Sequence, residues 1–307
     1  MSGVGQFISG RFGAIALWVL LVSWCDVGLA AAPAPRGAGA LLAKHEEIQG
    51  KLAHNQYDAP IFLESAESDG SVRVDMYGVV NSPFDVVRDA LQSPEQWCDI
   101  TPLHINIKAC TFKKSAQPAQ LTLYSGRKHY QPPSDAYPLK LKFRVVSHQP
   151  RFLELSLHAD DGPFGTKGHR ITLQAVPLDA RKSFLHFSYT YRHGPMARMA
   201  IKSYFSTLGR DKVGFSLADG KDGKRYYMDG VRGAIERNTM RYYLALQSYL
   251  DTSTYPENQR FEQRLSRWYD LTAKYPRQLK EMEKSDYLAS KRLEHANQVA
   301  LQRKEGK

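Results

Sequence analysis

The segment 79–102 reads VVNSPFDVVRDALQSPEQWCDITP and decides the fold. It begins as the end of an alternating strand and turns into a helix at Ser82 and Pro83. Pro is favoured at a first helical position, and Ser82 is placed to cap the helix, with Asp85 in the capping-box position three residues later. Pro94 either stops this helix or begins a second short turn. A helical excursion is therefore predicted inside a run of strands.

Segments on both sides of this excursion alternate apolar and polar residues, which predicts half-buried strands. In one of them, Leu141 and Phe143 oppose Lys142 and Arg144, so one face of the sheet is core and the other is solvated. Residues 229–251 carry the 3.6-residue period of a helix that can cover the apolar face. Seven strands are predicted, from Val72 onward and over 103–112, 120–124, 139–146, 152–158, 168–176 and 183–191.

This order of elements, carried by residues 79–102, resembles the START-like helix-grip superfamily of lipid-transfer, birch-pollen-allergen and polyketide-cyclase-like proteins. The motif Pro-x-x-Trp stands at 94–97, and the resemblance covers 61–251. It implies an α+β helix-grip fold, a curved antiparallel seven-stranded sheet wrapped around a long C-terminal helix, with extra C-terminal helices. It also implies a cavity for a lipid, sterol, isoprenoid or aromatic polyketide. A fully packed core is the alternative.

The N-terminus has the pattern of a secretory signal peptide. Arg11 precedes an apolar run over 12–22 that is too short to span a bilayer comfortably, and small residues follow at Gly28 and Ala30. We expect a periplasmic or secreted protein; an uncleaved anchor is the alternative. The expected parts are a signal peptide (1–30), a linker and short helix (31–60), the START-like domain (61–251) with an insertion or lid (194–228), and a helical C-terminal extension (252–307).

The formal net charge of +11 favours anionic partners. In an exported protein these are expected to be an anionic membrane surface rather than nucleic acid, and the alternative is that the charge only aids solubility. The sequence gives no preference for an oligomeric state. Cys98 and Cys110 remain after cleavage, an even number in an oxidising compartment, and are predicted to form a disulfide. Two buried free thiols are the alternative.

Polar side chains on the inward parity of the last strands and of the long helix give the candidate ligand-binding site. Each alone could be an ordinary core or rim residue, but together they could orient a hydroxyl or head group. They are His169, Phe187, Tyr189, Tyr191, Asn238 and Tyr242.

The insertion places Met196, Met199 and Phe205 beside basic residues. Flexible apolar side chains in a basic amphipathic segment predict a lid that touches a membrane. The alternative is a helix that packs on the domain.

Catalytic motifs are scarce. There is no Gly-x-Ser-x-Gly, no His pair at helical spacing and no Gly-rich phosphate loop, so no catalytic residue, cofactor or metal is expected. His158 and His169 flank Asp160 and Asp161, so a metal or acid–base cluster is an alternative there, although Asp-Asp-Gly-Pro is ordinary turn chemistry.

The sequence thus favours a protein that binds a hydrophobic small molecule and transports or sequesters it in the cell envelope. Binding is favoured over catalysis because the expected cavity face is mostly aliphatic and Tyr. One alternative is a cyclase or aromatase-type enzyme in which His169, Tyr189 and Tyr191 act on an aromatic or polyketide-like substrate. Another is a protein-interaction module that uses the basic tail.

Overall fold

The computed structural model describes residues 36–305 apart from 117, 207–211 and 221, and of residues 201, 202 and 204–206 it describes the backbone alone. The described residues belong to one compact unit. The predicted signal peptide, 1–30, lies outside the described residues.

The core of the fold is an eight-stranded antiparallel sheet in the order β1-β2-β8-β7-β6-β5-β4-β3. The strands are β1 Ile61–Ser68, β2 Ser71–Val80, β3 Ile107–Lys113, β4 Gln120–Ser125, β5 Tyr137–Gln149, β6 Phe152–Asp161, β7 Lys167–Pro177 and β8 Ser183–Arg192. A separate hairpin joins β9 Leu217–Asp219 to β10 Arg225–Tyr227.

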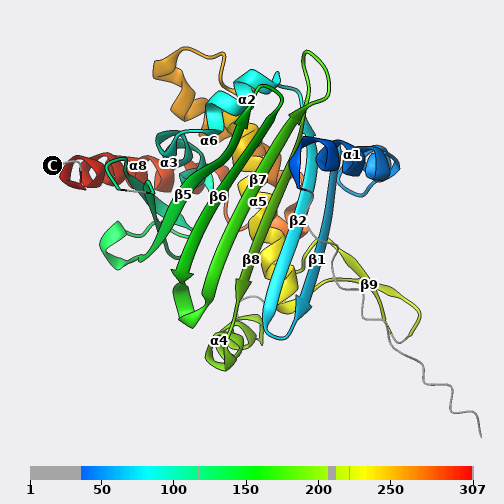
Figure 1. Ribbon diagram of the computed structural model, residues 1–307. Helices are drawn as coiled ribbons and strands as arrows, with labels where there is room; N and C mark the ends of the chain where they lie inside the picture. The colour runs from blue at the N-terminus through cyan, green and yellow to red at the C-terminus, as the bar shows by residue number, and fades with distance from the viewer. Residues whose placement is uncertain (1–35, 117, 207–211, 221, 306–307) are drawn as a thin grey trace, which may run out of the picture. The chain divides into compact units, whose positions relative to one another are not determined.

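Helices cover both faces of this sheet (Figure 1). They are α1 Gly37–Ala53, α2 Phe84–Leu91, α3 Pro94–Ile100, α4 Pro195–Ser206, α5 Gly230–Asp251, α6 Glu257–Ala273, α7 Pro276–Leu279 and α8 Lys284–Glu305. Three short 3-10 turns are η1 Thr101–Leu103, η2 Pro133–Asp135 and η3 Pro163–Gly165.

The arrangement confirms the predicted helix-grip fold, a sheet that holds the long helix α5 with further helices after it. The sheet has eight strands rather than seven, because β1 pairs with β2 along its whole length. In β1 the sequence IFLESAES buries Ile61 and Leu63 and then turns polar, as suits an edge strand. Its alternation is too short to be recognised in the sequence.

Two details of the opening segment differ from the prediction and one agrees with it. Ser82 does not cap α2; Pro83 occupies the cap position without a side-chain hydrogen bond, and the Ser82 carbonyl accepts from the Ser183 hydroxyl at 2.9 Å. Ser93 caps α3 instead, because its Oγ accepts from the N–H of Glu95 at 3.3 Å. The second proline therefore begins a new helix, one of the two alternatives for that position.

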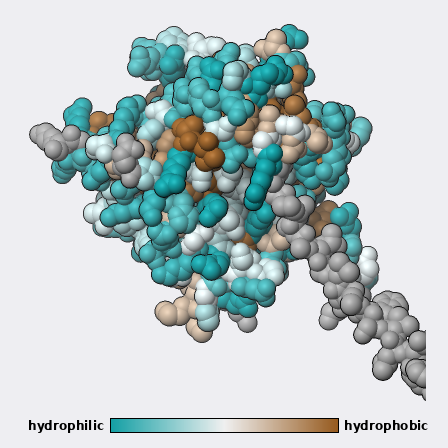
Figure 2. All heavy atoms as spheres, viewed as in Figure 1, coloured by the Kyte–Doolittle hydropathy of each residue, from teal (hydrophilic) through white to brown (hydrophobic). Residues whose placement is uncertain are grey.

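α1 is longer than the predicted short helix, and it covers part of the sheet face that was predicted to be solvated. Leu41, Ile48 and Leu52 are buried there. They pack on an outer-face cluster of Tyr77, Phe152, Val176 and Phe184. Around this contact the outer face viewed in Figure 2 is mostly hydrophilic.

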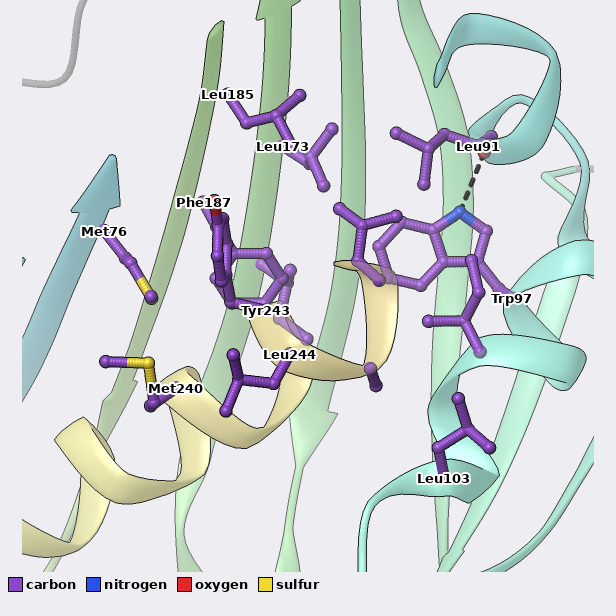
Figure 3. Close-up of a cluster of buried hydrophobic side chains, with 14 of the residues drawn as sticks. Met76, Leu91, Trp97, Leu103, Leu173, Leu185, Phe187, Met240, Tyr243 and Leu244 are labelled. Carbon is purple, nitrogen blue, oxygen red and sulfur yellow. Dashed lines mark hydrogen bonds between the residues drawn. The ribbon is translucent and has the colours of Figure 1, made fainter. Parts of the chain in front are cut away.

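α5 packs on the inner face of the sheet, against β1, β2 and β8. Gly78 of β2 allows the close approach, because a Cβ there would collide with the phenol of Tyr243. Trp97 fixes the two short helices to this core by donating from Nε1 to the carbonyl of Leu91 at 2.8 Å, and it is 4 % exposed (Figure 3).

α8 closes the edge of the sheet at β3. Gln298 accepts from the N–H of Cys110 at 2.8 Å and donates to the carbonyl of Cys98 at 3.0 Å. One turn later, Gln302 accepts from the N–H of Phe112 at 2.9 Å and donates to its carbonyl at 3.1 Å. These two amides satisfy edge groups that a ninth strand would otherwise bind.

The same helix carries a buried ion group. Glu294 binds Lys108 and Lys291, each with an N···O distance of 2.8 Å. Both lysines also donate to backbone carbonyls, among them those of Ile105 and Ile107. Burial lowers the pKa of Lys291 to about 8. The C-terminal helices therefore dock on the domain as part of its core.

Cys98 and Cys110 form the predicted disulfide, which joins α3 to β3 across a sequence separation of 12 residues. On the chain-entropy account, closing a loop of this length stabilises the fold by about 3 kcal/mol. Since Gln298 binds the backbone of both cysteines, the disulfide and the edge contact hold the same two segments.

We predict that Gln302→Leu lowers the free energy of unfolding by about 1–3 kcal/mol, because both backbone groups of Phe112 lose their partner. Denaturant titration followed by circular dichroism measures this. The control Gln259→Leu, at an exposed position of α6, should change stability by less than about 0.5 kcal/mol. An unchanged midpoint for Gln302→Leu would show that the amide does not support the edge.

Candidate functional site

The predicted site residues meet at one end of the interior, where β7 and β8 approach η3 and α4. In the sheet, Ile171 lies opposite Tyr189, and His169 lies opposite Ala159 of β6. From the helix side, the ring of Tyr242 stacks on that of Phe187 with centroids 6.5 Å apart. Tyr191 follows on β8, and Asn238 stands one turn before Tyr242 on α5. All six predicted ligand residues are thus brought together.

His169 and Tyr189 satisfy each other. His169 Nδ1 lies 2.8 Å from the Tyr189 hydroxyl, and its Nε2 lies 2.8 Å from Thr166 Oγ1. The Thr166 hydroxyl donates to the Pro163 carbonyl at 2.7 Å, so it accepts from Nε2–H, and Tyr189 donates to Nδ1. Hydrogen bonds thus run from Tyr189 to His169, from His169 to Thr166, and from Thr166 to the Pro163 carbonyl. The position of each proton in this series is fixed.

His169 therefore acts as a neutral support of the site wall. Burial lowers its pKa to about 4. Gly162 makes room for the ring, because a Cβ there would meet His169 Nε2. The ring also stacks on Tyr191 with centroids 5.3 Å apart.

Three other predicted residues, Tyr191, Asn238 and Tyr242, are half-buried. The two phenols make no hydrogen bond within the described part of the chain, whereas the side chain of Asn238 interacts with that of His104. Burial raises the pKa of Tyr191 to about 12 and also raises the pKa of Tyr242, so both phenols are neutral donors near pH 7. Inward polar groups with unused hydrogen-bonding capacity mark this end of the interior.

His104 belongs to the same group and was missed in the sequence. Its ring stacks on that of Tyr242 with centroids 4.5 Å apart, so His104, Tyr242 and Phe187 form a row of rings from the η1 loop to the sheet. His104 Nδ1 accepts from the N–H of Asn106 at 3.0 Å. His104 is 2 % exposed, and Nε2 has no hydrogen-bond partner among the described residues.

The pKa of His104 is lowered well below its usual value, first by burial and then by Arg241, Lys291 and Lys108. Asn238, whose side chain lies beside the ring, raises this pKa, but its effect is smaller. The imidazole is therefore neutral. Since Nδ1 accepts, Nε2 carries the proton.

Two hollows stand out among the described residues, and neither is the predicted cavity between the sheet and α5. One is an open depression lined by residues between Leu52 and Pro60. The other, near Ile105, Trp268 and Tyr287, measures about 10 Å³, the space of one water. Side chains fill the inner space in this conformation (Figure 3), so a lipid-sized guest would require some of them to move.

The insertion supplies an exposed apolar patch beside this end. Met196 and Met199 of α4 are 83 % and 72 % exposed. α4 packs near η3, where Phe164 is 75 % exposed and has a φ of 57°, an uncommon conformation for an aromatic residue. Figure 2 shows pale brown side chains at the lower end of the molecule, over α4. The side chain of Phe205 lies outside the described residues.

The alternative His and Asp cluster does not form. His158 pairs in register with Arg170 on the outer face, whereas His169 points inward beside Ala159. Over the described ranges, no group of three or more His, Cys, Asp and Glu residues could hold a metal ion. None of the described helices is long and apolar enough to cross a membrane.

We predict that the fold loses stability as the pH falls from 6.5 to 4. The unfolded state protonates His169 near pH 6.5, but the folded state does so near 4, so the unfolded state binds more protons in this window. The loss from this residue should reach about 3 kcal/mol. Denaturant titrations at several pH values should show a shallower slope for His169→Gln, and the wild-type slope for His148→Gln at an exposed position of β5. Equal slopes for all three proteins would contradict this.

No family model matches the sequence, and no curated protein matches it. Among solved structures, norcoclaurine synthase from Thalictrum flavum in complex with dopamine and hydroxybenzaldehyde is 13 % identical and has a TM-score of 0.34, covering 47 % of this chain and 82 % of its own. A START superfamily protein from Mycobacterium smegmatis is 14 % identical with a TM-score of 0.30, covering 45 % and 92 %. A conserved protein from Geobacillus kaustophilus is 8 % identical with a TM-score of 0.35, covering 59 % and 96 %.

Similarities this distant carry no inference about activity. The order and pairing of the chain's own elements give it an α+β helix-grip fold.

Proposed function

We propose that this protein binds a hydrophobic small molecule with one polar end, between the inner face of the sheet and α5. The observation that carries the proposal is a set of inward polar side chains with unused hydrogen-bonding capacity, those of His104, Tyr191, Asn238 and Tyr242. Buried polar groups are normally satisfied, and leaving one unpaired costs about 1–3 kcal/mol. A bound molecule with matching polar atoms would recover that cost.

The surroundings of these groups are apolar. Leu157, Ala159, Ile171 and Phe187 line the inner strands near them, each at most 6 % exposed. A ligand here would bury an aliphatic or aromatic body against these side chains, at about 25 cal/mol per Å² of apolar surface. A few polar groups in a mostly apolar wall are typical of small-molecule sites.

The way in would lie beside α4 and η3. The pair of His169 and Tyr189 forms a fixed wall there, because both nitrogens of the histidine are engaged. Tyr191 is half-buried and its hydroxyl is unbound within the described part of the chain, so it is well placed to move aside. Movement of Tyr191 and of α4 would open part of the space that side chains now fill.

A cyclase-type enzyme is less well supported. In that alternative His169 acts as an acid or base, but here it accepts from Tyr189 and donates to Thr166, and its pKa is lowered to about 4. A general base works best with a pKa near the working pH. The geometry favours binding and orientation of a ligand over proton transfer.

Carriage or sequestration in the cell envelope is the wider part of the proposal. It rests on the signal-peptide pattern at the N-terminus, on the formal net charge of +11 and on the exposed patch of Phe164, Met196 and Met199. An apolar patch at the end of the molecule where a ligand would enter, on a basic protein, suits contact with an anionic lipid surface.

We predict that Asn238→Trp lowers the affinity for Nile red, a neutral apolar dye, at least about tenfold. Because Asn238 is half-buried, the indole would fill the space beside His104 without replacing a fully buried side chain of α5. Fluorescence titration measures the affinity, and circular dichroism confirms folding. Asn258→Trp, on an exposed part of α6, should bind the dye as wild type does. Undiminished binding by a folded Asn238→Trp protein would place the dye elsewhere.

We predict that the triple variant Phe164→Ser, Met196→Ser, Met199→Ser reduces co-sedimentation with vesicles of phosphatidylglycerol and phosphatidylcholine several-fold, because the exposed side chains no longer insert. Its melting temperature should stay close to that of wild type, since all three are largely exposed. A control with serine at Val145 and Val146, exposed on β5, should bind vesicles normally. Equal sedimentation of all three proteins would reject the patch as a membrane contact.

A further inference from the structure

We propose that His104, Asn238 and Tyr242 bind the carboxylate of a long-chain carboxylic acid, and this inference rests on the proposed function. The first element is the imidazole of His104. It is 2 % exposed, its Nδ1 accepts from Asn106, and its protonated Nε2 has no partner among the described residues. A buried N–H fixed in this way is a donor that lacks an acceptor.

The three donors converge. Asn238 and Tyr242 are four residues apart on α5 and so share one face of the helix. The ring of Tyr242 stacks on that of His104 at 4.5 Å, and Asn238 lies close enough to His104 to influence its pKa. Tyr242 makes no side-chain hydrogen bond within the described part of the chain, and the amide of Asn238, whose interaction with His104 raises the pKa of that ring, has unused donors. The imidazole N–H, the amide NH₂ and the phenol O–H can therefore serve one acceptor group.

The electrostatic surroundings favour an anion at this point. Lys108 and Lys291 share the single carboxylate of Glu294, each at 2.8 Å, which leaves one net positive charge in this buried group. Both lysines, together with Arg241, lower the pKa of His104. The field that repels a proton from the ring attracts a negative charge placed beside it.

The number and kind of these donors indicate which polar head group of a ligand would fit them. A carboxylate has two oxygens with about four lone-pair sites and can use all three donors. A hydroxyl oxygen has two lone pairs and would leave at least one of the three donors without an acceptor. A phosphate carries more charge and is usually bound by cationic side chains in direct contact, whereas the three donors here are neutral.

The apolar body of such an acid would lie along the inner face of the sheet, once side chains that now fill that space had moved. From Tyr242 the row of rings leads through Phe187 to the inner face of β7 and β8, where Ile171 and Leu173 are buried. The acid would therefore lie with its head at the η1 loop and its chain along the sheet. The partly accessible Tyr191 lies on the same inward parity of β8 as Phe187.

The test compares hexadecanoate and hexadecanol as competitors of Nile red on the full chain at pH 7, where the acid is ionised and Lys291, with a pKa of about 8, is mostly protonated. We expect wild type to bind hexadecanoate at least about tenfold more tightly than hexadecanol, since hydrogen bonds to a charged group contribute about 1.5–3 kcal/mol. His104→Phe keeps the ring stack and removes the donor. It should reduce the preference to less than about threefold, with unchanged affinity for hexadecanol.

Two further variants make the comparison specific. Tyr242→Phe keeps the ring and removes one donor, so it should lose part of the preference even if His104→Phe fails to fold. His295→Phe is a matched control, because that histidine also stacks on an aromatic ring, Phe261, at 4.1 Å. It should retain the wild-type preference.

The outcomes separate the two proposals. If wild type binds Nile red but does not distinguish acid from alcohol, the carboxylate site is wrong and the proposed function stands. A preference that survives in both His104→Phe and Tyr242→Phe would likewise overturn the assignment. If wild type binds neither the dye nor either competitor, the proposed function fails and this inference fails with it.

Discussion

One helix cannot cover an eight-stranded sheet, and much of this structure follows from that mismatch. Seven strand spacings of about 4.8 Å give a sheet roughly 34 Å wide, whereas a helix with its side chains is about 10 Å wide. α5 lies against β1, β2 and β8, at one side of the sheet. The inner faces of the remaining strands must be covered by other elements or by a ligand.

The short helices and the C-terminal helices cover most of the inner face that α5 leaves open. Trp97 packs edge-on against Phe143 of β5, while α8 closes the side at β3 and α6 packs on α5 and α8. At the opposite end, near η3 and α4, the cover consists of single side chains such as Tyr242 and Tyr191. His169, whose two ring nitrogens are both hydrogen-bonded, lies there beside polar side chains that have unused donors. That contrast separates the wall of the candidate site from its binding groups.

The fold could be predicted from the sequence because its determinants are local and periodic. The Ser-Pro pair at 93–94, the alternation in β5 to β8 and the helical period of α5 each indicate one structure. β1 was missed because it is an edge strand that buries two apolar residues at its start. The capping role predicted for Ser82 was wrong: Pro83 occupies the cap position, and Ser82 instead contributes its carbonyl to a contact with Ser183, a residue far along the chain.

The candidate site could be predicted only in part, for a similar reason. The alternation of β7 and β8 identified His169, Tyr189 and Tyr191 as inward-facing residues. Alternation cannot show that the side chains of His169 and Tyr189 are hydrogen-bonded to each other. His104 was missed because the strand was predicted to start at Leu103, which would turn the histidine outward. The structure continues the helical turn through Leu103 and starts β3 at Ile107, so His104 turns inward.

The glutamine contacts at the edge of β3 also have a consequence for how the chain is made. Gln302 lies 190 residues downstream of the strand whose backbone it satisfies. At about 5–20 residues per second, a ribosome needs roughly 10–40 s to supply it. Throughout that interval a nascent chain would present an open β edge, so its yield in cells should depend on chaperones that shield exposed strands during translation.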